Sequence, residues 1–346
     1  MQIERVADAG AEWDAFVEAT RGATLGHASA WQRVLRSAYG LASEYLAARD
    51  PAGAIAGVLP LVRFRTLRGR LLLVSLPFLD SAGVLAASPA AEAALLDAAL
   101  ARARETGADR LELRQLEPLA SGPPPGALNR VDLFLKLEAN EQGQWTALPA
   151  KVRNQTRKAG REGLSLIEGG PEKLLQAFYG PFQRNMRDLG SPVHARRFFG
   201  AAAEAFGPRL RFVCTELGGQ PIGGLVAIHF AGEVSVPWAS TLREQRHRCP
   251  NHIIYWEALR WSIARGAQAL DFGRSPRGSG SHVFKLGWGA VERPLVWLAF
   301  TPDGRPLEVA GPDAGAWLQR LSQVWTRLPL TLTTQLGPRI RRRLSN

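Results

Sequence analysis

The sequence predicts an α/β (α+β) protein built from two similar domains in tandem, and three observations support this. The chain has 346 residues, which is more than one ordinary hydrophobic core organises. Hydrophobic residues make up 46% of the chain and charged residues 21%, as in folded globular proteins. The same order of strands and helix also occurs twice along the chain.

The first copy of this order starts near residue 44. Short apolar segments bounded by turn residues predict strands, and an alanine-rich segment with helical spacing follows them. The expected elements are strands at 44–50, 54–64 and 70–77, a helix at 90–107 and a closing strand at 108–114. A strand meander followed by a crossover helix and a further strand is an α/β unit.

The second copy starts near residue 211. Its expected elements are strands at 211–217, 221–230 and 233–241, a helix at 251–266 and a closing strand at 267–273. The two endings align, with TGADRLELR (106–114) matching RGAQALDFG (265–273). We interpret the repeat as a duplication; the alternative is chance similarity between two common strand–helix patterns.

The domain boundaries follow from this repeat. We expect an N-terminal domain at 1–145, a C-terminal domain at 146–305 and a C-terminal helix with a basic tail at 306–346. The proline run SGPPPGA (121–127) is expected to be a loop inside the first domain, because a strand-like segment, RVDLFLKLE (130–138), follows it.

The net charge of +12 favours an anionic partner. The candidate anionic partners are tRNA, nucleotide-linked sugars, anionic lipid and coenzyme A, whereas nothing in the sequence indicates DNA. The alternative explanation of this net charge is a composition that is generally rich in arginine. Only five of the 43 basic residues are lysines, and lysine supplies a compact point charge that arginine does not.

The sequence also predicts a cytoplasmic location. No apolar run reaches ~18 residues, the length that a membrane-spanning helix needs. The N-terminus, MQIERVADAGAEWDAF, carries acids where a signal peptide needs a basic start and an apolar stretch. The two cysteines, Cys214 and Cys249, form no CxxC motif and fit a reducing compartment.

Two basic stretches are candidate binding segments. The first, KVRNQTRKAGREG (151–163), is expected to bind a polyanion; a solvated helix face is the alternative. Its candidate residues are Lys151, Arg153, Arg157 and Lys158. The second, NMRDLGSPVHARRFFG (185–200), has substrate contacts expected at Arg187, His194 and Arg196 around a Gly-Ser-Pro turn. Here the alternative is that Asp188 only pairs with a neighbouring arginine.

A third stretch, DFGRSPRGSGSHVFKLGWGA (271–290), follows the closing strand of the second copy. In open α/β sheets, ligands gather at the carboxyl ends of strands. We expect this loop to hold an anionic group through Arg274, Ser275, Arg277 and Ser279. Lys285 follows near the same edge, where its charge would stabilise an oxyanion formed when a carbonyl is attacked.

Other chemistries lack their signatures. The loop at 271–290 is neither a Walker A loop nor a GxGxxG motif, and the chain has no GxSxG motif. No spacing of His, Cys and Asp suggests a metal site. We therefore expect no metal and no permanently bound cofactor.

Four stretches resemble the FemAB family of peptidyl and aminoacyl transferases. They are LVSLPFLDSAGVLA (73–86), LPAKVRNQTRKAGREGL (148–164), NMRDLGSPVHARRFF (185–199) and LDFGRSPRGSGSHVFKLGWG (270–289). The likeness is greatest to FemAB-like proteins associated with exosortase/PEP-CTERM systems and exopolysaccharide loci. The resemblance implies two GNAT-like acyltransferase domains in tandem. It also implies transfer of an aminoacyl group from tRNA to an amine of a cell-envelope precursor.

The resemblance assigns roles to three residues. Phe284 and Lys285 match a Phe-Lys pair whose lysine stabilises the tetrahedral intermediate, and Asp80 matches an aspartate that contacts substrate. There are departures: no heptad arm is present, and the basic residue of the first-domain helix has no clear counterpart. The GNAT coenzyme A signature is replaced by TLREQRHRCPNH (241–252), which lacks glycine.

These observations predict an acyltransferase that moves an aminoacyl or acyl group onto an amine of a cell-envelope saccharide or its precursor. The donor stays open between aminoacyl-tRNA and acyl-CoA. Two alternatives are an acyl-CoA-dependent GNAT N-acyltransferase and an inactive tRNA- or glycan-binding protein of the same fold. The C-terminal helix is expected either to pack on the protein or to contact the cytoplasmic membrane face.

Overall fold

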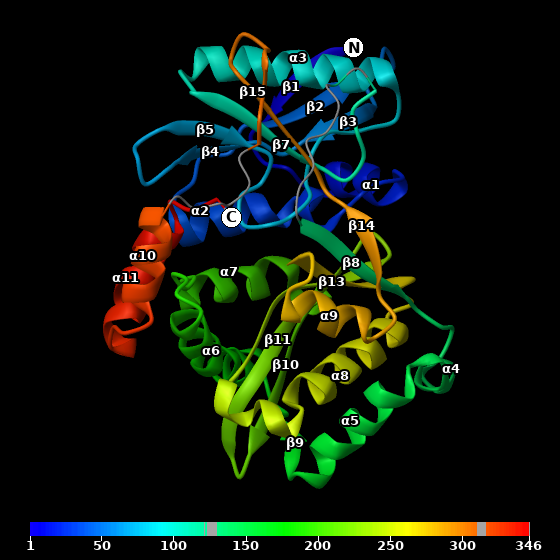
Figure 1. The fold of residues 1–346 in the computed structure, drawn as a ribbon. Coiled ribbons are helices and arrows are strands. Elements are labelled where there is room, and N and C mark those ends of the chain that lie inside the picture. The colour runs from blue at the N-terminus through cyan, green and yellow to red at the C-terminus, as the bar shows by residue number, and fades with distance from the viewer. Residues whose placement is uncertain (121, 123–129, 310–315, 346) are drawn as a thin grey trace. The chain divides into compact units, whose positions relative to one another are not determined.

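The computed structural model of the chain describes residues 1–120, 122, 130–309 and 316–345, with the side chains of 316–320 left out. The chain forms two compact units (Figure 1). Unit 1 comprises Met1–Val131, Arg293–Asp313 and Arg342–Asn346, and unit 2 comprises Asp132–Glu292 and Ala314–Arg341. The proline-rich loop expected at 121–127 lies outside the described residues, except for Gly122.

Unit 1 contains two sheets and a long helix. The strand orders are β1-β2-β3-β6 and β16-β15-β7-β5-β4. The strands are β1 (Gln2–Val6), β2 (Tyr45–Arg49), β3 (Ile55–Leu59), β4 (Val62–Arg65), β5 (Leu71–Val74), β6 (Leu85–Ala86), β7 (Arg110–Gln115), β15 (Val296–Phe300) and β16 (Pro306–Leu307). The helices are α1 (Ala11–Ala19), the 3-10 helix η1 (Leu25–His27), α2 (Ala30–Tyr39) and α3 (Pro89–Glu105).

Unit 2 is organised around one seven-stranded sheet with the order β14-β8-β13-β12-β11-β10-β9. The strands are β8 (Arg130–Lys136), β9 (Leu164–Leu166), β10 (Leu210–Leu217), β11 (Gln220–Phe230), β12 (Glu233–Thr241), β13 (Ala269–Pro276) and β14 (Val291–Pro294). The helices are α4 (Glu141–Ala147), α5 (Ala150–Arg161), α6 (Pro171–Asp188), α7 (Arg196–Phe206), η2 (Gly207–Arg209), η3 (Arg243–Arg248), α8 (Pro250–Ala264), α9 (Gly280–Leu286), α10 (Ala316–Trp325) and α11 (Leu330–Arg341). Figure 1 shows α6 on one side of β10 and β11 and α8 on the other.

The predicted duplication is confirmed by the connection between parallel strands. In unit 1, β5 leads through α3 to β7, and β5 pairs with β7 in parallel over three residue pairs that start at Leu72↔Arg110. In unit 2, β12 leads through α8 to β13, and these strands pair in parallel over three residue pairs that start at Glu233↔Ala269. Each unit therefore carries the same crossover and an equally short parallel ladder.

The boundaries of the compact units differ from the domain boundaries expected at 145/146 and 305/306. The segment 130–138, expected in the first domain, supplies β8 to the sheet of unit 2. The segment after β14 supplies β15, which pairs antiparallel with β7 over five residue pairs in unit 1. The expected basic tail is largely helical, because α11 extends to Arg341. Sheet pairing between distant segments, rather than chain order, sets these divisions.

The core of unit 2 is rich in aromatic side chains where α6 and α7 pack against the sheet. Phe178 of α6 lies with its ring centroid 5.0 Å from that of Phe199 of α7, and Phe199 packs edge-on against Trp238 of β12. In unit 1, α3 instead presents Ala91, Leu95, Ala99 and Ala103 to the sheets, all completely buried. Their spacing of four residues keeps one helix face against the strands.

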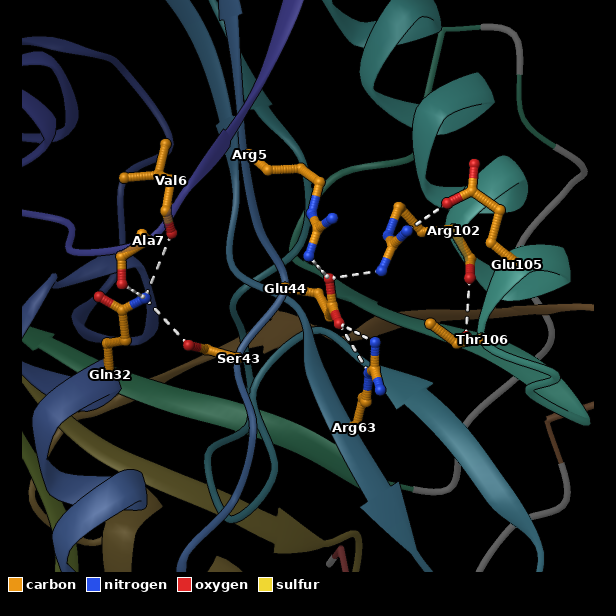
Figure 2. A network of polar contacts seen from close by, with 10 residues as sticks. All are labelled: Arg5, Val6, Ala7, Gln32, Ser43, Glu44, Arg63, Arg102, Glu105 and Thr106. Carbon is orange, nitrogen blue, oxygen red and sulfur yellow. Dashed lines mark hydrogen bonds and ion pairs between the residues drawn. The ribbon is translucent and has the colours of Figure 1, made fainter.

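A buried carboxylate connects the sheets of unit 1 with α3. Glu44 is only 4% exposed and accepts hydrogen bonds or ion pairs from Arg63 of β4 (2.6 Å), Arg102 of α3 (2.9 Å) and Arg5 of β1 (3.2 Å). Figure 2 shows the three guanidinium groups converging on this one side chain. Arg102 also pairs with Glu105. A buried charge is tolerated when it is paired and hydrogen-bonded in this way.

We predict that Glu44→Gln lowers the free energy of unfolding by about 1.5–3 kcal/mol, because the charge-assisted hydrogen bonds from Arg63 and Arg102 are lost and Arg102 keeps only its pair with the exposed Glu105. Chemical denaturation measures the change. Glu12→Gln is the matched control, since the ion pair of Glu12 with Arg49 is exposed and such pairs contribute little. Equal losses in the two variants would contradict the central role of Glu44.

Candidate active site

The parallel strands of unit 2 separate where the predicted site begins. β12 and β13 pair only from Glu233↔Ala269 to Ser235↔Asp271, although β12 continues to Thr241 and β13 to Pro276. β12 keeps its pairing with β11 as far as Thr241, so it is the contact with β13 that is lost. Beyond Asp271, the facing edges of β12 and β13 no longer form backbone hydrogen bonds with each other. Backbone groups along such edges can pair with an extended ligand.

Lys285 lies at this divergence. It is on α9, which begins after Ser279, whose side chain accepts a hydrogen bond from the backbone N–H of His282. The Lys285 side chain is 7% exposed, and its Nζ donates to the carbonyl oxygens of Gly273 (2.7 Å) and Arg274 (3.1 Å) on β13. The helix and the strand together hold a buried positive charge at the open end of the strand pair.

The loop that joins β13 to α9 is fixed by its own side chains. Ser279 Oγ donates to the carbonyl of Pro276, and Arg277 forms an ion pair with Glu292 (2.9 Å). Ser275 is completely buried, and its Oγ has no hydrogen-bond partner among the described residues. Of the residues expected to hold an anion, Ser279 and Arg277 thus already contribute to the loop conformation, and Arg274 lies half-buried on β13.

His282 is a further residue of this loop, and the sequence prediction did not include it. Its Nδ1 accepts a hydrogen bond from the N–H of Gly278 (3.3 Å), which leaves Nε2–H to donate to Glu292 (2.7 Å). The hydrogen bond from His282, followed by that from Arg277, holds the pKa of Glu292 below its usual value. His282 is three residues before Lys285, so the two share one face of α9, and this spacing could have indicated it.

Phe284 anchors α9 against α8. Its half-buried ring lies 5.4 Å from the ring of His252 and 5.5 Å from that of Tyr255, both on α8. His252 stacks in turn on Trp288. Burial, with the charge of Lys151 second, lowers the pKa of His252 to about 4, so this histidine is neutral at physiological pH. Its buried Nδ1 has no hydrogen-bond partner among the described residues, and such an atom calls for a ligand or ordered water.

The polyanion segment lies on α5, next to the start of α8. The charge of Lys158 lowers the pKa of the Cys249 thiol, although burial outweighs it and the net pKa is raised. The charges of Lys151 and Lys158 thus act to lower the pKa values of His252 and Cys249, which lie at the start of α8, where helix N–H groups lack intrahelical acceptors. Cys249, just before α8, has φ 61°, so the chain makes a left-handed turn there without glycine.

The two arginines of that segment face α4 instead. Arg153 donates from Nη1 to the carbonyl oxygens of Thr146 and Leu148, which closes the end of α4. The guanidinium carbon of Arg157 lies 5.2 Å from the centroid of the Trp145 ring. The four expected polyanion-binding residues thus divide into two lysines whose charges act on residues at the start of α8 and two arginines that pack on α4.

The structure places the α6–α7 candidates in three different settings. Arg187 pairs with the adjacent Asp188 (2.7 Å), which is the alternative that the sequence left open. Arg196 pairs with Glu172 and lies on the wall of a groove of about 830 Å³ in unit 2, bounded mainly by α6 and by the turn between β10 and β11.

His194 is a core residue, contrary to the expectation of a substrate contact. It is 1% exposed, stacks on Phe198 at 4.5 Å and accepts a hydrogen bond at Nε2 from Arg341 (3.0 Å). Burial, and then the charge of Arg341, hold its pKa well below the usual range. A neutral, enclosed imidazole of this kind supports packing, so we leave His194 out of the proposed site.

The corresponding place in unit 1 is filled by Arg114. Arg114 and Gly273 each lie four residues after the first residue of their strand that pairs in parallel, Arg110 and Ala269. Arg114 is 1% exposed, donates to the carbonyl oxygens of Leu79 (2.7 Å), Leu76 and Ser345, and lies 4.5 Å from the Trp297 ring. In unit 2 the same position has glycine and no side chain.

Asp80, the expected substrate contact, directly follows Leu79, whose carbonyl oxygen accepts a hydrogen bond from Arg114. Its carbonyl accepts a hydrogen bond from Trp297 Nε1 (2.9 Å), and its side chain is half-buried. The preceding backbone is strained, since Leu76 and Phe78 adopt φ values of 66° and 77° that side chains other than glycine rarely take. Strained backbone held by many contacts is common at ligand-binding sites.

The fold and the site define a protein with two GNAT-like domains in tandem. Residues 149–286 match the family model described as an acetyltransferase (GNAT) domain. FemX has the same fold, with a TM-score of 0.70 and 14% sequence identity, over 87% of this chain and 97% of FemX. The resemblance to the FemAB family is therefore confirmed at the level of the fold.

Two other solved structures are similar over most of the chain. A tandem GNAT protein from the clavulanic acid biosynthesis pathway has a TM-score of 0.50 and 14% identity, over 84% of this chain and 93% of its own. The C-terminal domain of a protein provisionally described as a lysylphosphatidylglycerol synthetase, from Agrobacterium fabrum, has a TM-score of 0.52 and 11% identity, over 78% and 86%. No curated protein matches the sequence.

We predict that the free energy of unfolding falls as the pH decreases from 6.5 towards 4, because His27, His194 and His252 bind protons in the unfolded chain that they do not bind in the folded protein. The pKa difference of His252 alone corresponds to a loss of up to about 3 kcal/mol. Denaturation at several pH values should show a smaller pH dependence for His252→Phe. The exposed His247 supplies the control, His247→Phe; an unchanged profile in His252→Phe would refute the assignment.

Proposed function

We propose that the protein is an acyltransferase whose chemistry takes place in unit 2, at the divergence of β12 and β13. The observation that carries this proposal is the buried ammonium of Lys285, fixed on the carbonyls of Gly273 and Arg274. The match of residues 149–286 to an acetyltransferase domain supports it. The transferred group is an aminoacyl or acyl group, and the acceptor is an amine.

The acyl arm of the donor would lie between the separated strands. Donors of both classes, an acyl-CoA thioester and an aminoacyl-tRNA, carry phosphates, which the first turn of α8 together with Lys151 and Lys158 would bind. The descriptions of two structures with a similar fold are compatible with either donor. The tandem GNAT protein is described as being without AcCoA, and the name of the synthetase refers to a lysyl group.

The proposed reaction needs no protein nucleophile. The acceptor amine attacks the carbonyl carbon of the donor, a C–N bond forms and the carbonyl oxygen becomes an oxyanion. The charge of Lys285 stabilises that oxyanion while the strand carbonyls hold the ammonium in place. The C–S or C–O bond to the donor then breaks, and the leaving thiolate or ribose oxygen takes the proton that the amine loses.

The acceptor is proposed from the sequence resemblance. It is an amine of a cell-envelope saccharide or its precursor, related to peptidoglycan or exopolysaccharide. Asp80 and Phe284, together with Arg274, Ser275, Arg187 and Arg196, remain proposed substrate-binding residues. The proposed location is the cytoplasm, where both classes of donor are made.

We predict that Lys285→Met reduces the turnover of the donor by about 10²–10³-fold, because the oxyanion loses its stabilising charge. Donor affinity should change little, since the side chain acts on the transition state. Turnover is measured with labelled acyl-CoA and aminoacyl-tRNA in the presence of amine acceptors.

The matched control for this prediction is Lys136→Met, at an exposed lysine on β8. Wild-type turnover in Lys285→Met would remove Lys285 from the mechanism. Donor binding without any turnover in the wild type would instead indicate a binding protein of the same fold.

We predict that Lys151→Gln and Lys158→Gln together weaken donor binding and reduce its dependence on salt, because each lysine releases counterions when it neutralises a phosphate. For tRNA, the slope of log affinity against log salt should fall by about 2. Titration of acyl-CoA and aminoacyl-tRNA side by side identifies the donor. Lys136→Gln removes one positive charge at an exposed position of β8 and should bind like the wild type; a weakening in it half as large as in the double variant would contradict a local phosphate site.

A further inference from the structure

The positive charge of the chain is concentrated in one segment of the sequence that the proposed chemistry does not use. Residues 314–346 contain six arginines and no aspartate, glutamate or lysine, so their net charge is +6 out of the +12 of the whole chain. Among the described residues, Arg327 and Arg339 are exposed and have no ion-pair partner. Unneutralised charge of one sign is typical of a surface that meets an anionic partner.

The same two helices and the end of α6 also carry exposed apolar side chains. Leu321 and Val324 on α10 are 53% and 55% exposed, Leu332 on α11 is 38% exposed and Leu189 at the end of α6 is 58% exposed. These are four of the ten large hydrophobic residues exposed in the described part of the chain. Solvent-facing leucines and valines that cluster in this way are typical of an interaction surface.

The packing of the two helices shows which faces they leave open. Gly190 lies against Ser322 of α10, where an added Cβ would come within 2.0 Å of the serine Oγ. An added Cβ at Gly337 of α11 would come within 2.9 Å of Val193. Both helices therefore pack on the same short segment between α6 and α7, which brings them together and next to Leu189.

The outer faces combine apolar and basic residues at helical spacing. Leu321 and Val324 are three residues apart, and Arg327 follows three residues later. On α11, Thr333 and Gly337 are buried, whereas Leu332 and Arg339, seven residues apart, are exposed along the opposite side. Leucine or valine thus lies near an exposed arginine both on α11 and at the end of α10, where Arg327 lies in the turn that follows the helix.

This combination distinguishes a lipid surface from a nucleic acid. Arginines alone would fit the phosphates of either partner. Exposed aliphatic side chains next to arginines fit a bilayer interface, where the aliphatic groups enter the acyl region and the guanidinium groups meet lipid phosphates. No helix in the described part of the chain is long and apolar enough to cross a membrane, so contact through these helices would be peripheral.

We propose that α10 and α11, together with Leu189, form a peripheral docking surface for a bilayer that contains anionic lipid. The proposal is independent of the transferase chemistry. It would hold the protein at the membrane face through side chains that take no part in the proposed catalytic site.

Vesicle co-sedimentation tests the proposal with the full chain. The protein should bind vesicles of equal parts phosphatidylcholine and phosphatidylglycerol, bind phosphatidylcholine vesicles weakly and lose binding as salt is raised. Arg339→Gln should lower the partition coefficient about fivefold, in line with the usual contribution of one basic residue near an anionic surface. Leu321→Glu combined with Val324→Glu should lower it further, because it removes the apolar contact and adds repulsion.

Two matched controls lie in unit 1. Leu67→Glu changes an exposed leucine and Arg70→Gln an exposed arginine outside the proposed surface, and both should bind vesicles like the wild type after allowance for total charge. Circular dichroism checks that each variant is folded. Failure of the wild type to bind anionic vesicles overturns the proposal. Binding to unacylated tRNA that Arg339→Gln weakens, while the Leu321→Glu, Val324→Glu variant still sediments with vesicles, also overturns it.

Discussion

Both units depend on one constraint, a parallel strand pair that holds for only three residue pairs. The crossover helices α3 and α8 bring the strands into parallel register, and each pair then separates. Separated edges inside a folded unit carry backbone N–H and C=O groups, and each such group left unsatisfied costs about 1–3 kcal/mol. The chain must therefore fill the space or leave it for a ligand. Unit 1 fills it with Arg114, whereas unit 2 has Gly273 there and brings Lys285 to the strand carbonyls.

This difference gives the two halves of a duplicated fold different roles. The Arg114 guanidinium closes the first divergence and fixes the strained backbone that leads to Asp80, which Trp297 holds from its other side. A pantetheine arm or an extended aminoacyl ester cannot occupy that space without displacing a buried charge, and displacing such a charge from its partners is costly. The strand divergence of unit 2 is therefore compatible with donor binding. That of unit 1 is instead compatible with a rigid binding loop before Asp80.

Sequence reasoning predicted the repeated crossover because strand and helix periodicity are local properties. It could not predict that β8 joins the second sheet or that β15 returns to the first, because pairing between distant segments decides both. The site shows the same division. Lys285 and the loop before it lie within one short stretch that the sequence singled out, whereas His194 is enclosed by contacts that include Arg341, far along the chain. A histidine after a Gly-Ser-Pro turn gives the same local pattern in a core and in a binding loop.

The uneven use of lysine and arginine follows from their chemistry. Arginines bind several acceptors at once, and this structure uses them as connectors: Arg102 on Glu44 and Glu105, Arg114 on carbonyls, and Arg153 on the end of α4. Of the five lysines, Lys285 lies at the strand divergence and Lys151 and Lys158 act on the start of α8. The compact ammonium group of lysine suits an oxyanion or a single phosphate, because the planar guanidinium group of arginine needs more space. Most basic residues of this chain are arginine. The positions of the few lysines are therefore the physical reason to place the acyl-transfer reaction in unit 2.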